Sequence, residues 1–116
     1  MNTLLTEAKH MLHYDEIILS SIKCSLETFQ YRGAARPGVL ILTNQKLFFY
    51  GPNMLGKAMF EEYSYHEIST IKEQKNLFGT KISILYGTEW IKFKYIQSSD
   101  PEAFVGKVRE KILLSK

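Results

Sequence analysis

Hydrophobic and polar residues follow two different periods along this chain, and the change of period predicts where helices and strands lie. Near the N-terminus the apolar residues recur every three or four positions, at Leu4, Leu5, Ala8 and Met11. This is the spacing of one face of an amphipathic helix. The pattern predicts an N-terminal helix over residues 1–14, with the rest of the chain, residues 15–116, as the main body of a single domain.

After this helix the period changes to two, which is typical of half-buried strands. A long strand is predicted over residues 17–29, and its apolar residues are expected to share one face. Residues 30–37 follow as a predicted loop, because they include glycine and Pro37, which lacks an amide hydrogen for strand pairing. The shared face of the first strand consists of Ile18, Ile22, Cys24 and Leu26.

Residues 38–51 contain two apolar runs, Val39 to Leu42 and Leu47 to Tyr50, separated by Thr43-Asn44-Gln45-Lys46. β-Branched and aromatic residues favour strands, and Asn44 tolerates the backbone conformations of a tight turn. The pattern therefore predicts a hairpin made of the second and third strands.

Four further strands are predicted over residues 57–63, 69–75, 81–86 and 89–95, separated by turns at residues 65–68, 76–79 and 87–88. In the last of these strands, the residues expected to face opposite sides of the sheet alternate along the sequence. Ile91, Phe93 and Tyr95 are expected on one face, and Trp90, Lys92 and Lys94 on the other.

The chain ends with the signature of an amphipathic helix. Ser99 or Asp100 supplies a cap oxygen, and Pro101 suits the first helical position. An apolar stripe follows, made of Phe104, Val105, Val108 and Ile112.

The hairpin pattern Gly-x-Leu-x-Leu-Thr-x-x-x-Leu-x-Phe, which begins at Gly38, and the segment from Tyr63 to Ile71 resemble bacterial pleckstrin-homology (PH) domains, in particular the YokE-like group and the related GRAM domains. The resemblance covers residues 15–114. It implies a mainly β, PH-like fold with helices: a seven-stranded antiparallel, partly open barrel of two bent sheets, capped by the C-terminal helix. The N-terminal helix is an addition to this pattern.

Length, composition and charge fit a single globular domain. The 116 residues are 45% hydrophobic and 23% charged, and no apolar run approaches the roughly 18 residues of a membrane-spanning helix. The net charge is +3, and the basic excess lies in residues 71–116, which is too small to predict nucleic-acid binding. We expect a cytoplasmic protein, because no secretory signal is recognisable and a single cysteine cannot form an internal disulfide. A peripheral position at the inner membrane surface is the second option.

The first candidate site is the loop after the first strand, where Arg32 and Arg36 follow Lys23. In lipid-binding PH domains this loop carries clustered basic residues that hold inositol phosphates, as the resemblance implies. Here the arginines are four positions apart with small neutral residues between them, which departs from the usual spacing. Solvated loop arginines are therefore favoured over an anion site.

The second candidate is the face of Trp90, Lys92 and Lys94, with Lys81 as a further member across the hairpin. Tryptophan beside lysine can anchor at a lipid interface or in a protein interface. The favoured alternative is structural, with Trp90 helping to cover the N-terminal helix.

The N-terminal helix is the third candidate. Its apolar stripe can pack on its own barrel, which we favour, or on a second chain. The stripe consists of Leu4, Leu5, Ala8 and Met11.

No catalytic motif, phosphate-binding loop or metal-ligand set is recognisable, so we expect no enzyme, no cofactor, no metal and no small-molecule substrate. His10 and His13 are interpreted as surface residues, and Cys24 as a small core residue.

The leading hypothesis is a non-catalytic module for protein–protein interaction or self-association. The alternative is weak peripheral binding of anionic membrane lipid through Arg32, Arg36, Lys92 and Lys94.

Overall fold

The computed structural model describes residues 3–27, 36–52, 58–77 and 79–116. The α-helices in this part of the chain are α1 (Thr3–Lys9) and α2 (Pro101–Leu114), and a short 3₁₀ turn, η2, spans Tyr65–Glu67. The strands are β1 (Ile18–Glu27), β2 (Arg36–Thr43), β3 (Leu47–Pro52), β4 (Ala58–Tyr63), β5 (Ile68–Asn76), β6 (Gly79–Tyr86) and β7 (Glu89–Gln97).

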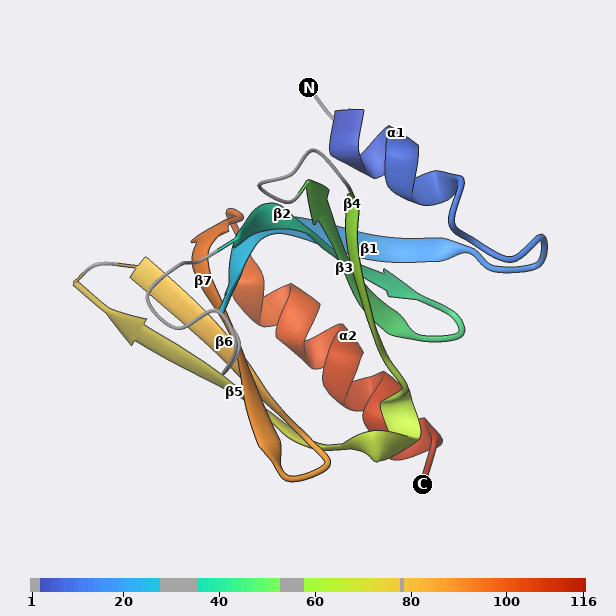
Figure 1. Cartoon of the computed structure of the whole chain (residues 1–116). Coiled ribbons are helices and arrows are strands. Elements are labelled where there is room, and N and C mark those ends of the chain that lie inside the picture. Colours follow the sequence, from blue (N-terminus) through green and yellow to red (C-terminus); the bar gives the residue numbers. More distant parts are fainter. Residues whose placement is uncertain (1–2, 28–35, 53–57, 78) are drawn as a thin grey trace.

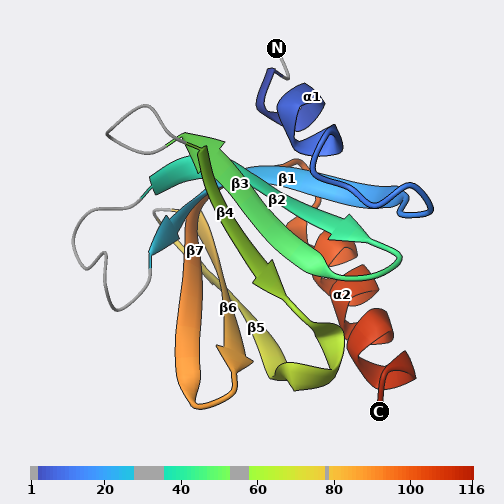
Figure 2. The same ribbon diagram turned by 45° about the vertical axis from the view of Figure 1, so that its right-hand side comes forward.

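The strands form one antiparallel sheet in the order β4-β3-β2-β1-β7-β6-β5. The sheet bends into two halves, and α2 lies in the opening between them (Figures 1 and 2). This arrangement confirms the predicted helix-capped, partly open barrel. None of the helices in the described residues is long and apolar enough to cross a membrane.

The predicted hairpin is confirmed, and the amide of Thr43 donates to the carbonyl of Lys46 at 3.0 Å across its turn. Both faces of the hairpin are buried, which explains why its two runs are apolar without alternation. One face joins the main core inside the barrel. The other face forms a second, smaller cluster made of Val39, Ile41, Phe48 and Tyr50.

Helix α1 covers this second cluster on the outside of the barrel (Figure 1). The helix is shorter than the predicted 1–14, because a compact turn follows it. In that turn the amide of His13 donates to the Glu16 carboxylate at 3.1 Å, and the amide of Glu16 donates to the His13 carbonyl at 3.0 Å. These bonds compete with continuation of the helix.

Helix α2 begins as its sequence predicts. The Asp100 carboxylate accepts a hydrogen bond from the amide of Ala103 at 3.1 Å, so Asp100 rather than Ser99 is the cap. The predicted apolar stripe is buried in the main core, and it consists of Phe104, Val105, Val108 and Ile112.

Two register shifts overturn predictions of side-chain direction. The pairing of β1 with β2 shifts between Ile18 and Ser20, so Ile18 packs in the cluster under α1 and not with the inner residues of β1. The pairing of β1 with β7 shifts near Tyr95, which is 67% exposed instead of following Phe93 into the core. A bulge adds a residue to one strand, and the alternation reverses beyond it.

Candidate functional site

The outer face of β5–β7 brings together the aromatic and basic residues of the second candidate. Trp90 of β7 lies opposite Leu85 of β6, and Lys92 lies opposite Ser83. Ser83 in turn lies opposite Lys72 of β5. Directly opposite residues share one face of a sheet, so Lys72, Ser83 and Lys92 form a row beside the Trp90 row. We call this surface the Trp90 face.

Trp90 is 38% exposed, and the Lys72 ammonium lies 4.9 Å from the centre of its ring. This is the geometry of a cation–π contact. The interpretation in which Trp90 covers the N-terminal helix is wrong, because α1 packs against β2 and β3 and Trp90 is in neither hydrophobic cluster. Sequence reasoning did not identify Lys72, because nothing in the sequence specifies which residue of β5 lies beside Trp90.

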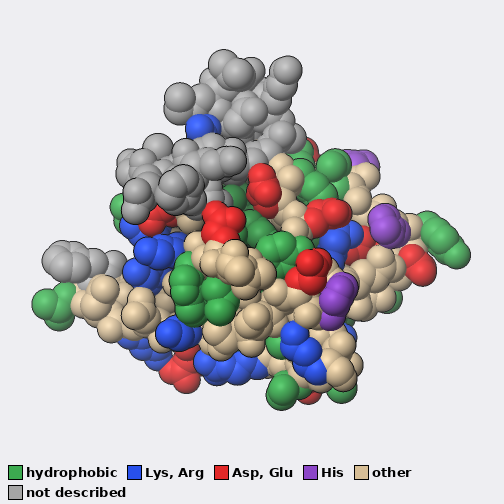
Figure 3. Space-filling view, turned by 60° about the horizontal axis from the view of Figure 1, so that its bottom comes forward, with side chains coloured by type: hydrophobic (Ala, Val, Ile, Leu, Met, Phe, Trp, Pro, Cys, Tyr) green, Lys and Arg blue, Asp and Glu red, His purple; other side chains and the backbone are tan. Residues whose placement is uncertain are grey.

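The lysines of the Trp90 face differ in their surroundings. Lys94 forms an ion pair with Glu27 of β1, with Nζ 2.8 Å from Oε1. Lys72 and Lys92 form no ion pair with any residue that the structure describes. Figure 3 shows Lys and Arg side chains gathered around hydrophobic ones on its left side, where Figure 1 places β5 and β6. Glu27 also lies directly opposite Lys92. The three lysines together with this one carboxylate leave a net positive charge beside the exposed ring of Trp90.

The structure separates the other basic candidates from this face. Arg32 lies outside the described residues. Arg36 begins β2 opposite Leu26, and Leu26 lies opposite Phe93. Both of these partners are fully buried, so Arg36 belongs to the inner face of the sheet, whereas Lys92 and Lys94 belong to the outer face. Arg36 and the β7 lysines thus do not form one site.

The N-terminal stripe lies on its own chain. Ala8 is fully buried, and Leu4 and Leu5 are half-buried against the cluster on the β2–β3 hairpin. The Tyr50 hydroxyl donates to the Glu7 carboxylate at 3.0 Å, which ties α1 to β3. Met11 follows the helix and is 42% exposed. Intramolecular packing thus accounts for most of the stripe.

A buried polar cluster, which sequence reasoning missed, joins residue 16 to the hairpin turn. The carboxylate of Glu16 accepts hydrogen bonds from the Lys46 ammonium at 2.8 and 2.9 Å, and from the Thr43 hydroxyl at 2.5 Å. Burial alone would raise the pKa of Glu16, but the hydrogen bonds from Lys46 and Thr43 outweigh it and hold the pKa below its ordinary value. The Lys46 ammonium also lies 3.6 Å from the carboxylate of the more exposed Glu62. The contacts of Lys46 with Glu16 and Thr43 join the segment before β1 to the hairpin turn, which is a structural role.

Cys24 is buried in the main core, and burial raises the pKa of its thiol to about 12. A thiol with this pKa is not a nucleophile at neutral pH. His10 and His13 are exposed. Within the described residues, no group of three or more His, Cys, Asp or Glu side chains is placed to hold a metal ion.

Comparisons with known proteins agree with this fold. A PH domain from Shewanella amazonensis SB2B is 13% identical, with 97% of each chain covered and a TM-score of 0.66. The Vps36 N-terminal PH domain is 12% identical over 90% of this chain and 86% of that chain, with a TM-score of 0.65. The C-terminal domain of an unknown protein from Leishmania infantum is 20% identical over 84% of this chain and 85% of that chain, with a TM-score of 0.66.

Likeness at these identities shows the fold alone, and no curated protein matches the chain. The more specific resemblance to YokE-like and GRAM domains stays a prediction. The family model described as "Bacterial PH domain" matches residues 12–110, which is most of the chain. The chain therefore belongs to the bacterial PH domain family.

Proposed function

We propose that this protein is a non-catalytic binding module whose Trp90 face binds an acidic surface of a partner protein. The observation that supports the proposal is the exposed ring of Trp90 beside Lys72 and Lys92, two lysines without an ion-pair partner among the described residues. Tryptophan is enriched among the residues that dominate binding energy in protein interfaces. This proposal does not use α1, whose apolar stripe is covered by its own hairpin.

The two kinds of residue have different roles in such an interface. The lysines attract an acidic partner during the encounter and set the salt dependence of association. The indole ring contributes apolar area that is removed from water on contact. Because Lys72 already lies over the ring, part of the bound arrangement exists before the partner arrives.

Affinity capture from cells of the source organism tests the proposal. Trp90→Ala and the double variant Lys72→Gln/Lys92→Gln are compared with the unchanged protein at low and high salt. Tyr14→Ala and Lys9→Gln are the matched controls, because both residues are exposed and lie far along the chain from β7. We expect an acidic protein that the controls retain and that both Trp90-face changes lose. Equal capture by Trp90→Ala and the unchanged protein would contradict the proposal.

Peripheral binding to an anionic membrane is the second candidate, since an exposed tryptophan beside lysines also suits a lipid interface. It would place the protein at the cytoplasmic surface of the membrane. Each lysine near an anionic surface contributes about 1 kcal/mol, so attachment through this face would be weak and sensitive to salt. Co-sedimentation with vesicles of phosphatidylglycerol tests it, and no binding at low salt removes this candidate.

A further inference from the structure

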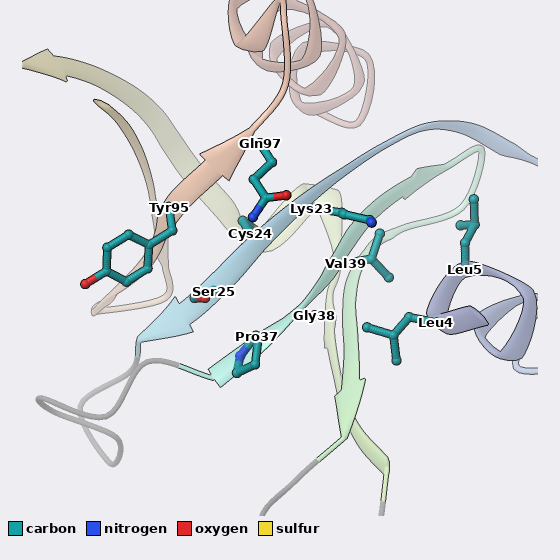
Figure 4. A pocket seen from close by; sticks show the side chains of 10 residues that line it. All are labelled: Leu4, Leu5, Lys23, Cys24, Ser25, Pro37, Gly38, Val39, Tyr95 and Gln97. Atoms are coloured by element: carbon teal, nitrogen blue, oxygen red, sulfur yellow. The ribbon is translucent and has the colours of Figure 1, made fainter. Parts of the chain in front are cut away.

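A pocket of about 300 Å³ lies on the outer face of β1, between α1 and the end of β7 (Figure 4). The Trp90 ring lies near the opposite end of β7, but the two surfaces adjoin at Lys94, which lies opposite the pocket residue Ser25. Lys23 is central to it, with Gln97 of β7 opposite on one side and Val39 of β2 opposite on the other. Leu4 and Leu5 of α1 form a further wall.

The bulge in β7 shapes one side of this pocket. Lys23 pairs with Gln97 and Ser25 pairs with Lys94, so two residues of β7 oppose the single residue Cys24. One of these two, Tyr95, has a φ of 54°, a left-handed conformation that is unusual for a residue other than glycine. In Figure 4 the Tyr95 ring points away from Lys23. Strained backbone of this kind is often found beside functional sites.

The lining has one charged end and one apolar end. The side chains of Lys23 and Gln97 both extend over the pocket in Figure 4, and Leu4 points toward it from α1. Lys23 forms no ion pair with any described residue, so its charge is available to a ligand. Leu4, Leu5 and Val39 supply apolar surface on the other side.

We infer that this pocket binds a small carboxylate with a short alkyl chain. The carboxylate pairs with the Lys23 ammonium and accepts a hydrogen bond from the Gln97 amide or the Ser25 hydroxyl. The alkyl chain lies against Leu4 and Val39. A single lysine matches a monoanion better than a doubly charged phosphate, and a volume at the lower end of the range for ligand pockets limits the ligand to a small molecule.

Titration of the ¹⁵N-labelled protein, residues 1–116, with sodium hexanoate tests this inference. We expect saturable shifts of the amide signals of Lys23, Ser25, Val39 and Gln97. Lys23→Gln should weaken binding at least fivefold, whereas Lys107→Gln, a change of an exposed lysine on α2, should not. Acetate, which lacks the chain, and hexanamide, which lacks the charge, should each bind at least tenfold more weakly than hexanoate.

Three results would overturn the inference: no saturable shift with hexanoate, equal affinity of Lys23→Gln and the unchanged protein, or tighter binding of inorganic phosphate than of hexanoate. The spectrum of Lys23→Gln also shows whether the variant is folded. Trp90→Ala should leave hexanoate binding unchanged, so the result is independent of the proposed protein-binding role of the Trp90 face.

Discussion

Glu16 and Lys46 form a buried ion pair in which the Lys46 Nζ lies 2.8 Å from one carboxylate oxygen of Glu16 and 2.9 Å from the other. The pair connects the segment before β1 to the turn between β2 and β3. Asn44 reinforces the connection, because its side-chain oxygen accepts from the amide of Ile17 at 2.7 Å. The hairpin that fills the core and the segment that leads from α1 are thus held together by polar contacts.

Lys46→Met should destabilise the protein strongly, because it leaves the Glu16 carboxylate buried without its cation. Loss of one partner of a buried pair costs about 3 to 5 kcal/mol, which urea unfolding can measure. Lys75→Gln is the control, since it removes one partner of the exposed pair that Lys75 forms with Glu102. This control should have no measurable effect. An equally small effect of Lys46→Met would show that the buried pair contributes little to stability.

The same pair predicts how stability changes in acid. The pKa of Glu16 is lower in the folded protein than in the unfolded chain, so the unfolded chain binds the proton first as the pH falls. The stability that Glu16 contributes is fully present above the unfolded pKa and is lost as the pH falls through the folded pKa. Unfolding free energies measured through this acid range should fall more steeply for the unchanged protein than for Glu16→Gln. Parallel curves would contradict this assignment.

Replacing each of two buried tyrosines with phenylalanine should change the unfolding free energy differently, because only one of their hydroxyls has a hydrogen-bond partner within the described part of the chain. The Tyr63 hydroxyl is buried and has no hydrogen-bond partner among the described residues, whereas the Tyr65 hydroxyl donates to the carbonyls of Thr43 at 2.6 Å and Lys46 at 2.9 Å. Tyr63→Phe should therefore leave the unfolding free energy unchanged or raise it by up to about 1 kcal/mol. Tyr65→Phe should lower it by about 1 to 3 kcal/mol, since it removes a buried hydroxyl that donates to the Thr43 carbonyl, whereas the Lys46 carbonyl keeps the Thr43 amide as a donor. A larger loss for Tyr63→Phe than for Tyr65→Phe would reverse this reading.

Deletion of residues 1–13 should expose the outer cluster of the hairpin. Val39, Ile41, Phe48 and Tyr50 would then form an uncovered apolar patch, because α1 packs on them in the intact chain. We expect a lower unfolding free energy and concentration-dependent association, measured by light scattering. Ala8→Asp, which places a charge at a fully buried position of α1, should have the same effect, and Met11→Ser, at an exposed position, should not. A stable monomer after the deletion would show that α1 does not protect this surface.

Most of the fold was predictable because the apolar pattern of its elements is local. The hairpin of residues 38–51 and the stripe from Phe104 to Ile112 appear in the structure as expected. The errors lie where distant strands meet. The directions of Ile18 and Tyr95 depend on bulges in the pairing with other strands, which alternation within one strand does not reveal.

The candidate site was predictable only in part, for the same reason. Trp90 and Lys92 share a face by simple alternation, and the structure agrees. The place of Lys72 beside Trp90, and of Arg36 on the opposite face of the sheet, follows from registers across several strands. Such registers are set by tertiary packing, so they cannot be predicted from the sequence of one strand.

Site-specific photo-crosslinking in living cells can show whether the Trp90 face binds an acidic protein. A photo-reactive amino acid is placed at Thr70, which lies opposite Leu85 and thus in the row of Trp90, and at Tyr14 as an exposed control position. We expect one crosslinked acidic protein from position 70 that disappears when Lys72 and Lys92 are changed to glutamine, and none from position 14. Crosslinks from position 14 alone, or crosslinks from position 70 that survive the lysine changes, would contradict this expectation.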